Sequence, residues 1–305
     1  MVKTALVTGA TGFLGRQVSQ TFDLAGFQVV GTGKSRANPP AALKLSLSTP
    51  ADISSALEEI RPDVVVHCAA NRFPDKCDAN PEEAREINVE ASRNLARATS
   101  SKNVLLIYIS TDYVFSGKPG EAPYEADTIP APTNLYGETK LEGEKAILQA
   151  TDESALGVVL RVPVLYGKSD DPKESAVNVL MDVLWKSQDK DSRTRISMDD
   201  WARRYPTNIE DVARVCVDIA TKYLDGERDQ MPKILQFSSE TCFTKYEICQ
   251  LFAEIMGLSL DGLVADKAGN DPNASVQRPF DTHLSTQALK DIGINVGTQD
   301  FKAWW

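Results

Sequence analysis

The stretch "VTGATGFLG" (residues 7–15) places three glycines between an apolar run and a segment with helical periodicity. Gly9 permits a tight turn, Gly12 lets a diphosphate approach the backbone, and Gly15 allows a helix to pack closely on a strand. The helix that follows presents free N–H groups and a positive dipole end to the phosphates. A purely structural turn is the alternative, but the strand–loop–helix context predicts a dinucleotide-binding loop. The expected contacts are Gly9, Thr11, Gly12, Phe13, Leu14 and Gly15.

Around this loop, short apolar runs alternate with segments of helical periodicity. Nearly continuous apolar strands are typical of a parallel sheet that helices cover on both faces. The sequence therefore predicts an α/β fold with a doubly wound, Rossmann-type parallel sheet. Strands are expected at residues 3–8, 27–32, 63–69, 103–110 and 156–162, with a weaker candidate at 43–47, and helices near 13–25, 52–60, 81–101 and 134–150.

Beyond residue 165 this alternation weakens and the polar loops become longer. Helical patterns occur near 209–223 and 244–256, and the charged stretch "SQDKDSRTR" (187–195) predicts a solvated loop. Such a section commonly forms a smaller lobe over the carboxyl ends of the strands, where open α/β sheets bind ligands. We expect a dinucleotide-binding domain at 1–164 and about 205–236, and a smaller C-terminal α/β lobe for a substrate or partner at about 165–204 and 237–305.

The composition restricts the class of function. A formal net charge of −10 and a pI near 4.9 argue against general binding to nucleic acid or to an anionic membrane. No apolar run approaches the ~18 residues of a membrane-spanning helix. Strand-like residues begin at once with "VKTALVTG", so a cytoplasmic location is expected. Five cysteines without a CxxC pair, and two histidines, give no metal-ligand pattern, and no metal site is expected.

The turn after the second expected strand carries information on the cofactor. Sites that prefer NAD place an acidic residue there, which holds the ribose 2′-hydroxyl. The sequence instead has "GTGKSRANPP" (31–40), without Asp or Glu, and its Lys34, Ser35 and Arg36 would surround a 2′-phosphate. A solvated basic turn is the alternative. The pattern favours NADP(H) over NAD(H) as the cofactor.

Tyr136 and Lys140 are four residues apart, so they share one face of an expected helix. A lysine ammonium beside the phenol, together with a nicotinamide's positive charge, would lower the tyrosine's pKa from its ordinary value of about 10. The phenol would then exchange a proton with a carbonyl or an alcohol. Thr111, next to Ser110 at the end of the fifth expected strand, would supply a hydroxyl that orients the substrate oxygen.

In this order along the chain, "TGATGFLG", "ISTDYVFSG" and "NLYGETK" resemble the extended short-chain dehydrogenase/reductase family, and the resemblance covers nearly the whole chain. By that resemblance Thr111, Tyr136 and Lys140 are the catalytic residues. Asn88 matches the helix asparagine that helps to place the lysine and a proton-relay water. The resemblance also implies cofactor contacts from the turn beside the cofactor, the catalytic helices and the segment that flanks the nicotinamide end, namely Ala69, Ala70, Asn88, Tyr136, Lys140 and Arg161.

Two branches of this family share the "STDYVF" and "TKLEGE" segments. One is dTDP-4-dehydrorhamnose reductase, which reduces a 4-keto sugar nucleotide, and the other is the regulatory β subunit of eukaryotic methionine adenosyltransferase. The chain is more similar to the second, in "IPAPTNLYGETKLEGEKAIL" (129–148), "MDDWARRYPTNIEDVARVC" (198–216) and "QRPFDTHLSTQALKDIGI" (277–294). That similarity implies NADP binding and a partner, the catalytic subunit of the synthetase.

The resemblance leaves the function open, because the regulatory branch keeps the same catalytic residues. The chain would be an NADP(H)-binding regulator, or an NADPH-dependent reductase of a carbonyl substrate such as a 4-keto sugar nucleotide or a specialised metabolite. A redox-sensing NADP-binding protein with another partner is a third interpretation. The aromatic tail Phe301–Trp305 would bind a partner or fold back on its own domain, and the sequence favours neither.

Several other polar residues are given structural roles. His67 follows an apolar run and is expected to pack or to bond to the backbone rather than to act in catalysis. His283 is assigned no chemistry. Arg203, Arg204 and Arg278 are expected to form ion pairs rather than to hold a ligand phosphate.

Overall fold

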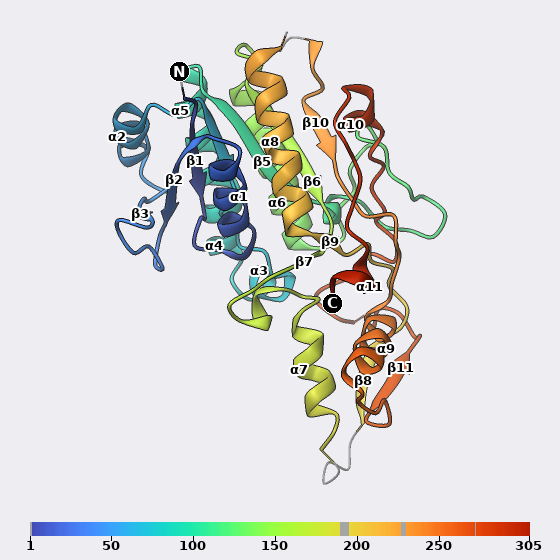
Figure 1. The fold of residues 1–305 in the computed structure, drawn as a ribbon. Coiled ribbons are helices and arrows are strands. Elements are labelled where there is room, and N and C mark those ends of the chain that lie inside the picture. Colours follow the sequence, from blue (N-terminus) through green and yellow to red (C-terminus); the bar gives the residue numbers. More distant parts are fainter. Residues whose placement is uncertain (1, 190–194, 227–229, 272) are drawn as a thin grey trace.

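A computed structural model of the chain describes residues 2–189, 195–226, 230–271 and 273–305, and it contains one central seven-stranded sheet (Figure 1). The strand order is β10-β6-β5-β4-β1-β2-β3, and every neighbouring pair is parallel. This arrangement confirms the doubly wound, Rossmann-type fold, and it adds β10 at one edge to the six expected strands. The strands are β1 (Thr4–Thr8), β2 (Gln28–Gly33), β3 (Leu43–Lys44), β4 (Val64–His67), β5 (Leu105–Thr111), β6 (Gly157–Val162) and β10 (Ile234–Gln236).

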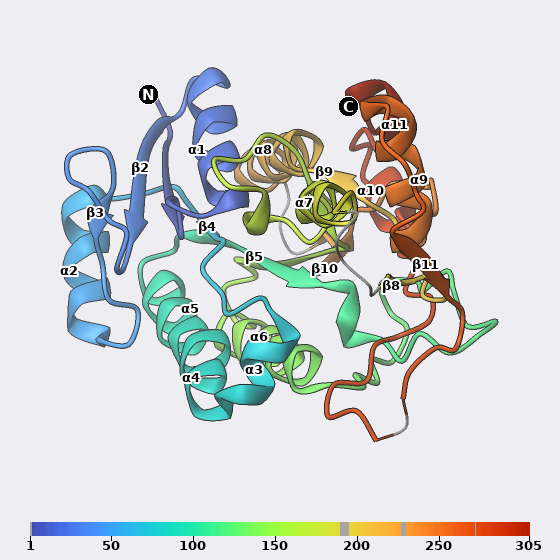
Figure 2. The ribbon, with the colours of Figure 1, turned by 90° about the horizontal axis from the view of Figure 1, so that it is seen from below.

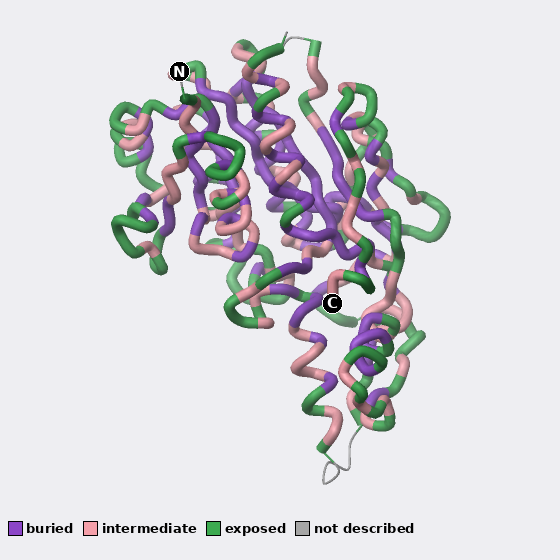
Figure 3. The backbone as a smooth tube through the Cα atoms, in the orientation of Figure 1, coloured by how far each residue is buried: buried purple, intermediate pink, exposed green. Residues whose placement is uncertain are grey.

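Helices cover both faces of this sheet (Figure 2). Alternate residues of a strand point to opposite faces, so Val7 packs into the core on one side of β1 and Leu6 into the core on the other. Buried residues run along the central strands as a result (Figure 3). Among the described residues, no helix combines the length and hydropathy needed to cross a bilayer. One face carries α1 (Phe13–Leu24) and α8 (Ile209–Asp225), and the other carries α2 (Pro50–Ile60), α5 (Ala91–Ser101) and α6 (Leu135–Ala150).

The order in which the chain adds strands to the sheet reverses at β1. From β1 the chain adds β2 and β3 on one side, and β4 then pairs with the other side of β1. Doubly wound sheets bind ligands at the carboxyl ends of the strands where the strand order reverses in this way. Gly9 has a φ of 69°, and a Cβ on it would lie 2.8 Å from the backbone nitrogen of Ala69. Glycine is therefore required here both for its conformation and for the closeness of the two loops.

The helical segment expected near 81–101 is confirmed, and it contains a π-helical turn that the sequence did not predict. α4 (Pro81–Arg85) runs into a π-helical turn, η1 (Glu86–Glu90), which leads into α5. The turn contains Asn88, which is buried and bonds to the backbone of Asn71 through both side-chain atoms, at 2.8 and 3.0 Å. Single π turns occur frequently at functional sites. Here the turn places a buried amide against the loop that follows β4.

A smaller lobe lies at the carboxyl ends of the strands (Figure 1). It contains α7 (Val179–Lys186), α9 (Lys245–Met256) and a parallel pair of strands, β8 (Ile196–Asp199) and β11 (Leu263–Asp266). Its core is separate from those of the main sheet. The sequence did not predict α7, β8 or β11, and residues 190–194 of the loop expected at 187–195 lie outside the described residues. The remaining short elements are α3 (Pro74–Ala79), η2 (Asp112–Val114), β7 (Leu165–Tyr166), η3 (Pro172–Glu174), β9 (Thr207–Asn208), α10 (Gln287–Asp291) and α11 (Phe301–Trp304).

The aromatic tail packs on this smaller lobe. The ring of Phe301 is buried, with its centroid 4.7 Å from that of Tyr166. The ring of Trp305 lies 4.7 Å from that of Phe252, and 4.7 Å from that of Trp304. Of the two roles left open by the sequence, the structure shows the tail folded back on its own chain.

A buried ion pair joins α6 to the central sheet. Arg161 on β6 donates from Nε and Nη2 to the two carboxylate oxygens of Glu144, at 3.0 and 2.8 Å, and each side chain is 2% exposed. Ser110 donates to the same carboxylate, and Arg161 Nη1 donates to Gln236 at 3.2 Å. A pair buried in this way is tolerated because its polar atoms are bonded, whereas either charge alone would be strongly unfavourable.

We predict that Glu144→Ala lowers the free energy of unfolding by about 3–5 kcal/mol, because it leaves the Arg161 guanidinium buried without its counter-charge. Glu142→Ala is the matched control on the same helix. Glu142 pairs with Arg85 at 2.7 Å, but both side chains are more than 40% exposed, so its loss should cost less than about 1 kcal/mol. Urea unfolding measures both, and equal losses in the two variants would contradict the prediction.

Candidate functional site

A cavity of about 660 Å³ opens at the carboxyl ends of β1, β2, β4 and β5. It is large enough for a ligand of several rings. Most of the residues that the sequence singles out come together on its wall. These are Gly9, Thr11, Gly12, Phe13, Leu14, Gly15, Lys34, Ser35, Arg36, Ala69, Ala70, Ser110, Thr111, Tyr136 and Lys140.

The glycine loop forms a floor that side chains would fill. A Cβ on Gly15 would lie 2.1 Å from the carbonyl oxygen of Gly9, and one on Gly12 would lie 3.1 Å from the same oxygen. Gly12 is the N-cap of α1, and no side chain caps this helix, so its first N–H groups face the cavity without a side-chain partner. A narrow, donor-rich floor at a helix N-terminus fits a diphosphate.

Basic side chains surround one end of the cavity. Lys34, Ser35 and Arg36 follow β2 as expected, and Arg36 pairs with Glu174 at 3.4 Å. The sequence missed Arg72, which also lines the cavity and lies over the ring of Phe73 at 4.4 Å. The position of Arg72 in the sequence could have predicted this, because the residue directly follows the turn at the carboxyl end of β4, where such sheets bind ligands.

Tyr136 and Thr111 also line the cavity. The ring of Tyr136 meets that of Tyr113 edge-on, with centroids 5.9 Å apart. Burial raises the pKa of the Tyr136 phenol well above its ordinary value, and a hydrogen bond with Thr111 opposes that rise. The phenol therefore keeps its proton at neutral pH, and it can act as a proton donor to an oxygen in the cavity.

Lys140 lies deeper than Tyr136 on the same face of α6. Its Nζ donates to the carbonyl oxygen of Ile109 at 2.7 Å and lies 3.9 Å from the ring centroid of Tyr108. Burial lowers the pKa of this ammonium to about 7, although Glu144, one turn further along, opposes the change. The lowering of the Tyr136 pKa that the sequence predicts was for a site that also holds the positively charged nicotinamide, so it stays a prediction. In the chain alone, desolvation is the largest influence on the pKa of both groups.

Two predicted site residues lie outside the cavity wall. Asn88 lies behind it, where its amide also donates to the hydroxyl of Thr139 at 3.0 Å. It therefore positions the loop after β4 against α6. The prediction that Arg161 contacts the cofactor is corrected, because its guanidinium is directed into the core and bonds to Glu144, as described above.

Asp112 links Thr111 to the C-terminal segment. Thr111 Oγ1 donates to Asp112 Oδ1 at 3.1 Å, and Thr282 Oγ1 donates to Asp112 Oδ2 at 2.6 Å. Burial raises the pKa of this carboxyl to about 6, despite the two hydroxyl donors. The Thr111 proton is thus directed to Asp112, and the Thr111 oxygen accepts from the backbone N–H of Tyr113 at 3.2 Å.

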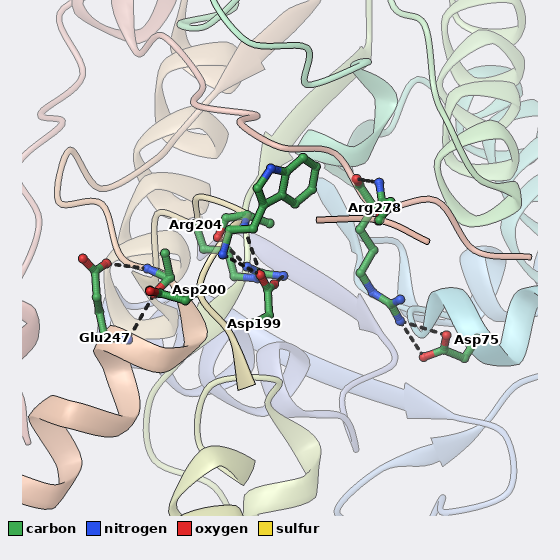
Figure 4. Close-up of polar contacts among 10 residues, drawn as sticks. Asp75, Asp199, Asp200, Arg204, Glu247 and Arg278 are labelled. Carbon is green, nitrogen blue, oxygen red and sulfur yellow. Dashed lines mark hydrogen bonds and ion pairs between the residues drawn. The ribbon is translucent and has the colours of Figure 1, made fainter. Parts of the chain in front are cut away.

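The arginines of the smaller lobe form ion pairs, as expected (Figure 4). Arg204 pairs with Asp199 at 2.8 Å, and Arg278 reaches across to Asp75 on α3 at 2.8 Å. The contact of Arg278 with Asp75 joins the C-terminal segment to α3, which follows β4 of the central sheet. Arg203 pairs with Asp281 at 3.6 Å.

The two histidines are also structural. His67 is buried between Thr8 and Ser92, at 2.7 and 3.1 Å from their hydroxyls, and burial lowers its pKa to about 3. It is therefore neutral at physiological pH. His283 stacks on Tyr205 with centroids 4.0 Å apart.

Comparison with known proteins adds the family. The model of the RmlD substrate binding domain matches residues 3–302. The chain belongs to this family. It is 38% identical over 296 residues to methionine adenosyltransferase 2 subunit beta of Xenopus tropicalis, covering 97% of this chain and 84% of that protein. It is also 38% identical to dTDP-4-dehydrorhamnose reductase of Streptomyces griseus, but over 162 residues, which are 53% of this chain and 50% of that one.

Solved structures show the same fold. The dTDP-4-dehydrorhamnose reductase of Bacillus anthracis, in complex with NADP, superimposes with a TM-score of 0.82 at 22% identity, covering 100% of this chain and 97% of that one. These relatives confirm the extended short-chain dehydrogenase/reductase assignment. They place the chain on the branch that holds the methionine adenosyltransferase β subunits and dTDP-4-dehydrorhamnose reductases.

We predict that Asp112→Asn stabilises the protein at neutral pH but not in acid. The carboxyl titrates at about 6 when folded and near 3.8 when unfolded, so its ionisation costs stability that is absent below pH 3.8 and fully present above pH 6. Removing the charge should raise the free energy of unfolding at pH 7 by roughly 1–3 kcal/mol relative to wild type, at ~1.4 kcal/mol per pKa unit. Urea unfolding at pH 4 and pH 7 tests this, and a difference that does not grow with pH would contradict it.

Proposed function

We propose that this chain is an NADP(H)-binding regulatory subunit of methionine adenosyltransferase, of the β type. The observation that carries the proposal is whole-chain similarity. The relatives named subunit beta match 97% of this chain, whereas the Streptomyces reductase matches 53% at the same identity. The partner on this proposal is the catalytic subunit of the synthetase, which makes S-adenosylmethionine. The smaller lobe and the C-terminal segment supply the surface for a partner or a substrate.

The cavity supports a nicotinamide dinucleotide as the ligand. Gly9, Gly12 and Gly15 would hold its diphosphate. The N–H groups in the first turn of α1, which no side chain caps, would be the donors. Lys34, Ser35 and Arg36 would surround the adenosine 2′-position, and the absence of a carboxylate in that turn favours NADP(H) over NAD(H). When bound, the nicotinamide ring supplies a carbon that accepts or donates a hydride.

Tyr136 and Lys140 would serve a regulator as well as an enzyme. Both residues line the cavity, and they would bind the ribose beside the nicotinamide. Lys140 is already held by the carbonyl of Ile109, so little side-chain entropy remains to be lost when it bonds to a ribose hydroxyl. A regulator that responds to cofactor needs this firm contact, and it needs no turnover.

Reduction of a carbonyl compound is the second candidate function, and the assembled Thr111, Tyr136 and Lys140 favour it. Tyr136 Oη holds its proton at neutral pH and would give it to the carbonyl oxygen, while Thr111 would orient that oxygen. A sugar nucleotide with a 4-keto group, or a specialised metabolite, would be the substrate class. The regulatory proposal stands first because these residues are expected in both branches, whereas the similarity to the proteins named subunit beta extends over 97% of this chain.

Tyr136→Phe, compared with the wild type, tests the reductase function. On the reductase hypothesis, NADPH oxidation with a carbonyl substrate should fall at least about 100-fold, because the proton donor is lost, while dinucleotide affinity changes less than about threefold. Absorbance at the NADPH band and calorimetric titration measure the two quantities. Wild-type protein that oxidises no NADPH with any carbonyl compound, yet binds the dinucleotide, would remove the reductase function and leave the regulatory one.

The regulatory proposal predicts an effect on the synthetase. Adding this chain to the catalytic subunit should change the apparent affinity for methionine or ATP by about fivefold or more, a typical coupling between sites. The size of this effect, or the affinity of the complex, should differ with and without NADP(H). The Bacillus dTDP-4-dehydrorhamnose reductase, which has the same fold, is the control and should leave the kinetics unchanged. If neither protein co-purifies with the catalytic subunit or alters its kinetics, the proposal fails.

A further inference from the structure

We infer that Glu174 weakens the preference for NADP(H) over NAD(H) by competing with the 2′-phosphate of NADP(H) for Arg36. The inference rests on the proposed dinucleotide binding. It assigns an influence on dinucleotide preference to a residue that lies far from the glycine loop in sequence. Glu174 ends the short helix η3, in the segment that links β7 to α7. This segment also supplies Ser175 and Ala176 to the cavity wall.

Glu174 is the shared anion of two cationic side chains from separate elements. Arg16 on α1 donates through both Nη atoms to the two oxygens of Glu174, one of them at 3.1 Å. Arg36, after β2, donates from Nη1 to Glu174 Oε1 at 3.4 Å. The carboxylate therefore occupies the position that an anionic ligand group would take between these guanidiniums.

The contact of Glu174 with Arg16 is stronger than its contact with Arg36. The pair with Arg16 is bidentate, Arg16 also donates to the carbonyl of Thr11 at 3.0 Å, and the Glu174 side chain is 13% exposed. The hydrogen bond from Arg16 lowers the pKa of Glu174, so the carboxylate is ionised. Arg36 is 62% exposed and makes one long contact. Arg36 can therefore exchange its partner while Glu174 stays with Arg16.

The backbone around Glu174 prevents the carboxylate from moving away easily. Ser175 Oγ donates to the carbonyl of Leu165 at 2.7 Å and accepts from the backbone nitrogens of Val177 and Asn178. Asn178 donates to the carbonyl of Gly167 at 2.8 Å. These contacts hold the segment onto β7, and they keep the negative charge at the rim of the cavity.

Arg36, when paired with Glu174, lies over the glycine loop. Its Nη2 is 3.8 Å from the position of a Cβ on Gly12. Arg72 also lines the cavity. The guanidiniums of Arg16 and Arg36 thus share the carboxylate of Glu174, and the exposed Asp170 is a further acid at 3.4 Å from Arg16.

This charge arrangement discriminates between dinucleotides. NADP(H) has a 2′-phosphate that must take Arg36 from Glu174 and lie near that carboxylate, whereas NAD(H) has a hydroxyl there. Glu174 therefore weakens the preference for NADP(H) that the basic turn creates. Neutralising it should strengthen binding of the dinucleotide with the larger negative charge.

The experiment measures calorimetric dissociation constants for NADP⁺ and NAD⁺ with four variants and wild type at low ionic strength, where screening is weak. Glu174→Gln should bind NADP⁺ about fivefold more tightly and NAD⁺ less than about twofold more tightly, because only the former uses Arg36. Asp170→Asn is the matched control in the same segment, and it should leave the ratio of the two constants unchanged. Arg36→Ala and the double variant Arg36→Ala/Glu174→Gln complete a double-mutant cycle, in which Glu174→Gln should no longer alter the ratio.

The outcomes separate the two claims. Wild-type protein that binds neither dinucleotide would overturn the proposed function and this inference with it. Wild-type binding with a ratio that Glu174→Gln leaves unchanged would overturn the inference alone. A change of ratio that persists without Arg36, or that Asp170→Asn reproduces, would show a general effect of charge and would also overturn it. Thermal unfolding of each variant confirms that the fold is retained.

Discussion

The close contact between two backbone turns at the carboxyl ends of β1 and β4 is the constraint on which the site depends. Gly9 can bring its loop to Ala69 because it has no side chain, and Gly15 brings α1 onto the carbonyl of Gly9 for the same reason. Together they leave a donor-lined floor under the cavity. Every other wall of the site, from the basic turn to Tyr136, is placed relative to this floor by the parallel order of the strands.

Desolvation is the main electrostatic effect in the cavity. It raises the pKa of Tyr136 and of Asp112 and lowers that of Lys140, in each case toward the neutral form. The chain alone therefore presents a protonated phenol, a lysine that titrates near neutrality and a hydroxyl directed by Asp112. A bound cation or anion would change these directions, since a charged ligand acts at short range in a site from which water is excluded. Binding of a charged cofactor would thus be coupled to the protonation of Tyr136, Asp112 and Lys140.

The same residues serve a reductase and a cofactor-responsive regulator, so the site by itself does not separate them. What separates the branches of the family is the rest of the chain, and there the similarity to the β subunits extends over nearly the whole length. The smaller lobe carries the aromatic tail within its own core and is tied to the main sheet's side by the contact between Arg278 and Asp75. The two parts of the molecule thus meet around the cavity, where a bound dinucleotide would contact both.

The sequence by itself determined the parallel sheet, the glycine loop, the basic turn and the shared face of Tyr136 and Lys140. Each depends on periodicity or spacing within a few residues, which the backbone geometry of a strand or a helix converts directly into position. The tertiary structure alone decided that Arg161 turns into the core, that a π turn places Asn88 against Asn71, and that Glu174 meets Arg16, which is 158 residues away. It also decided the pKa directions, because burial is a property of the assembled cavity and no local pattern records which distant segments will exclude water from a side chain.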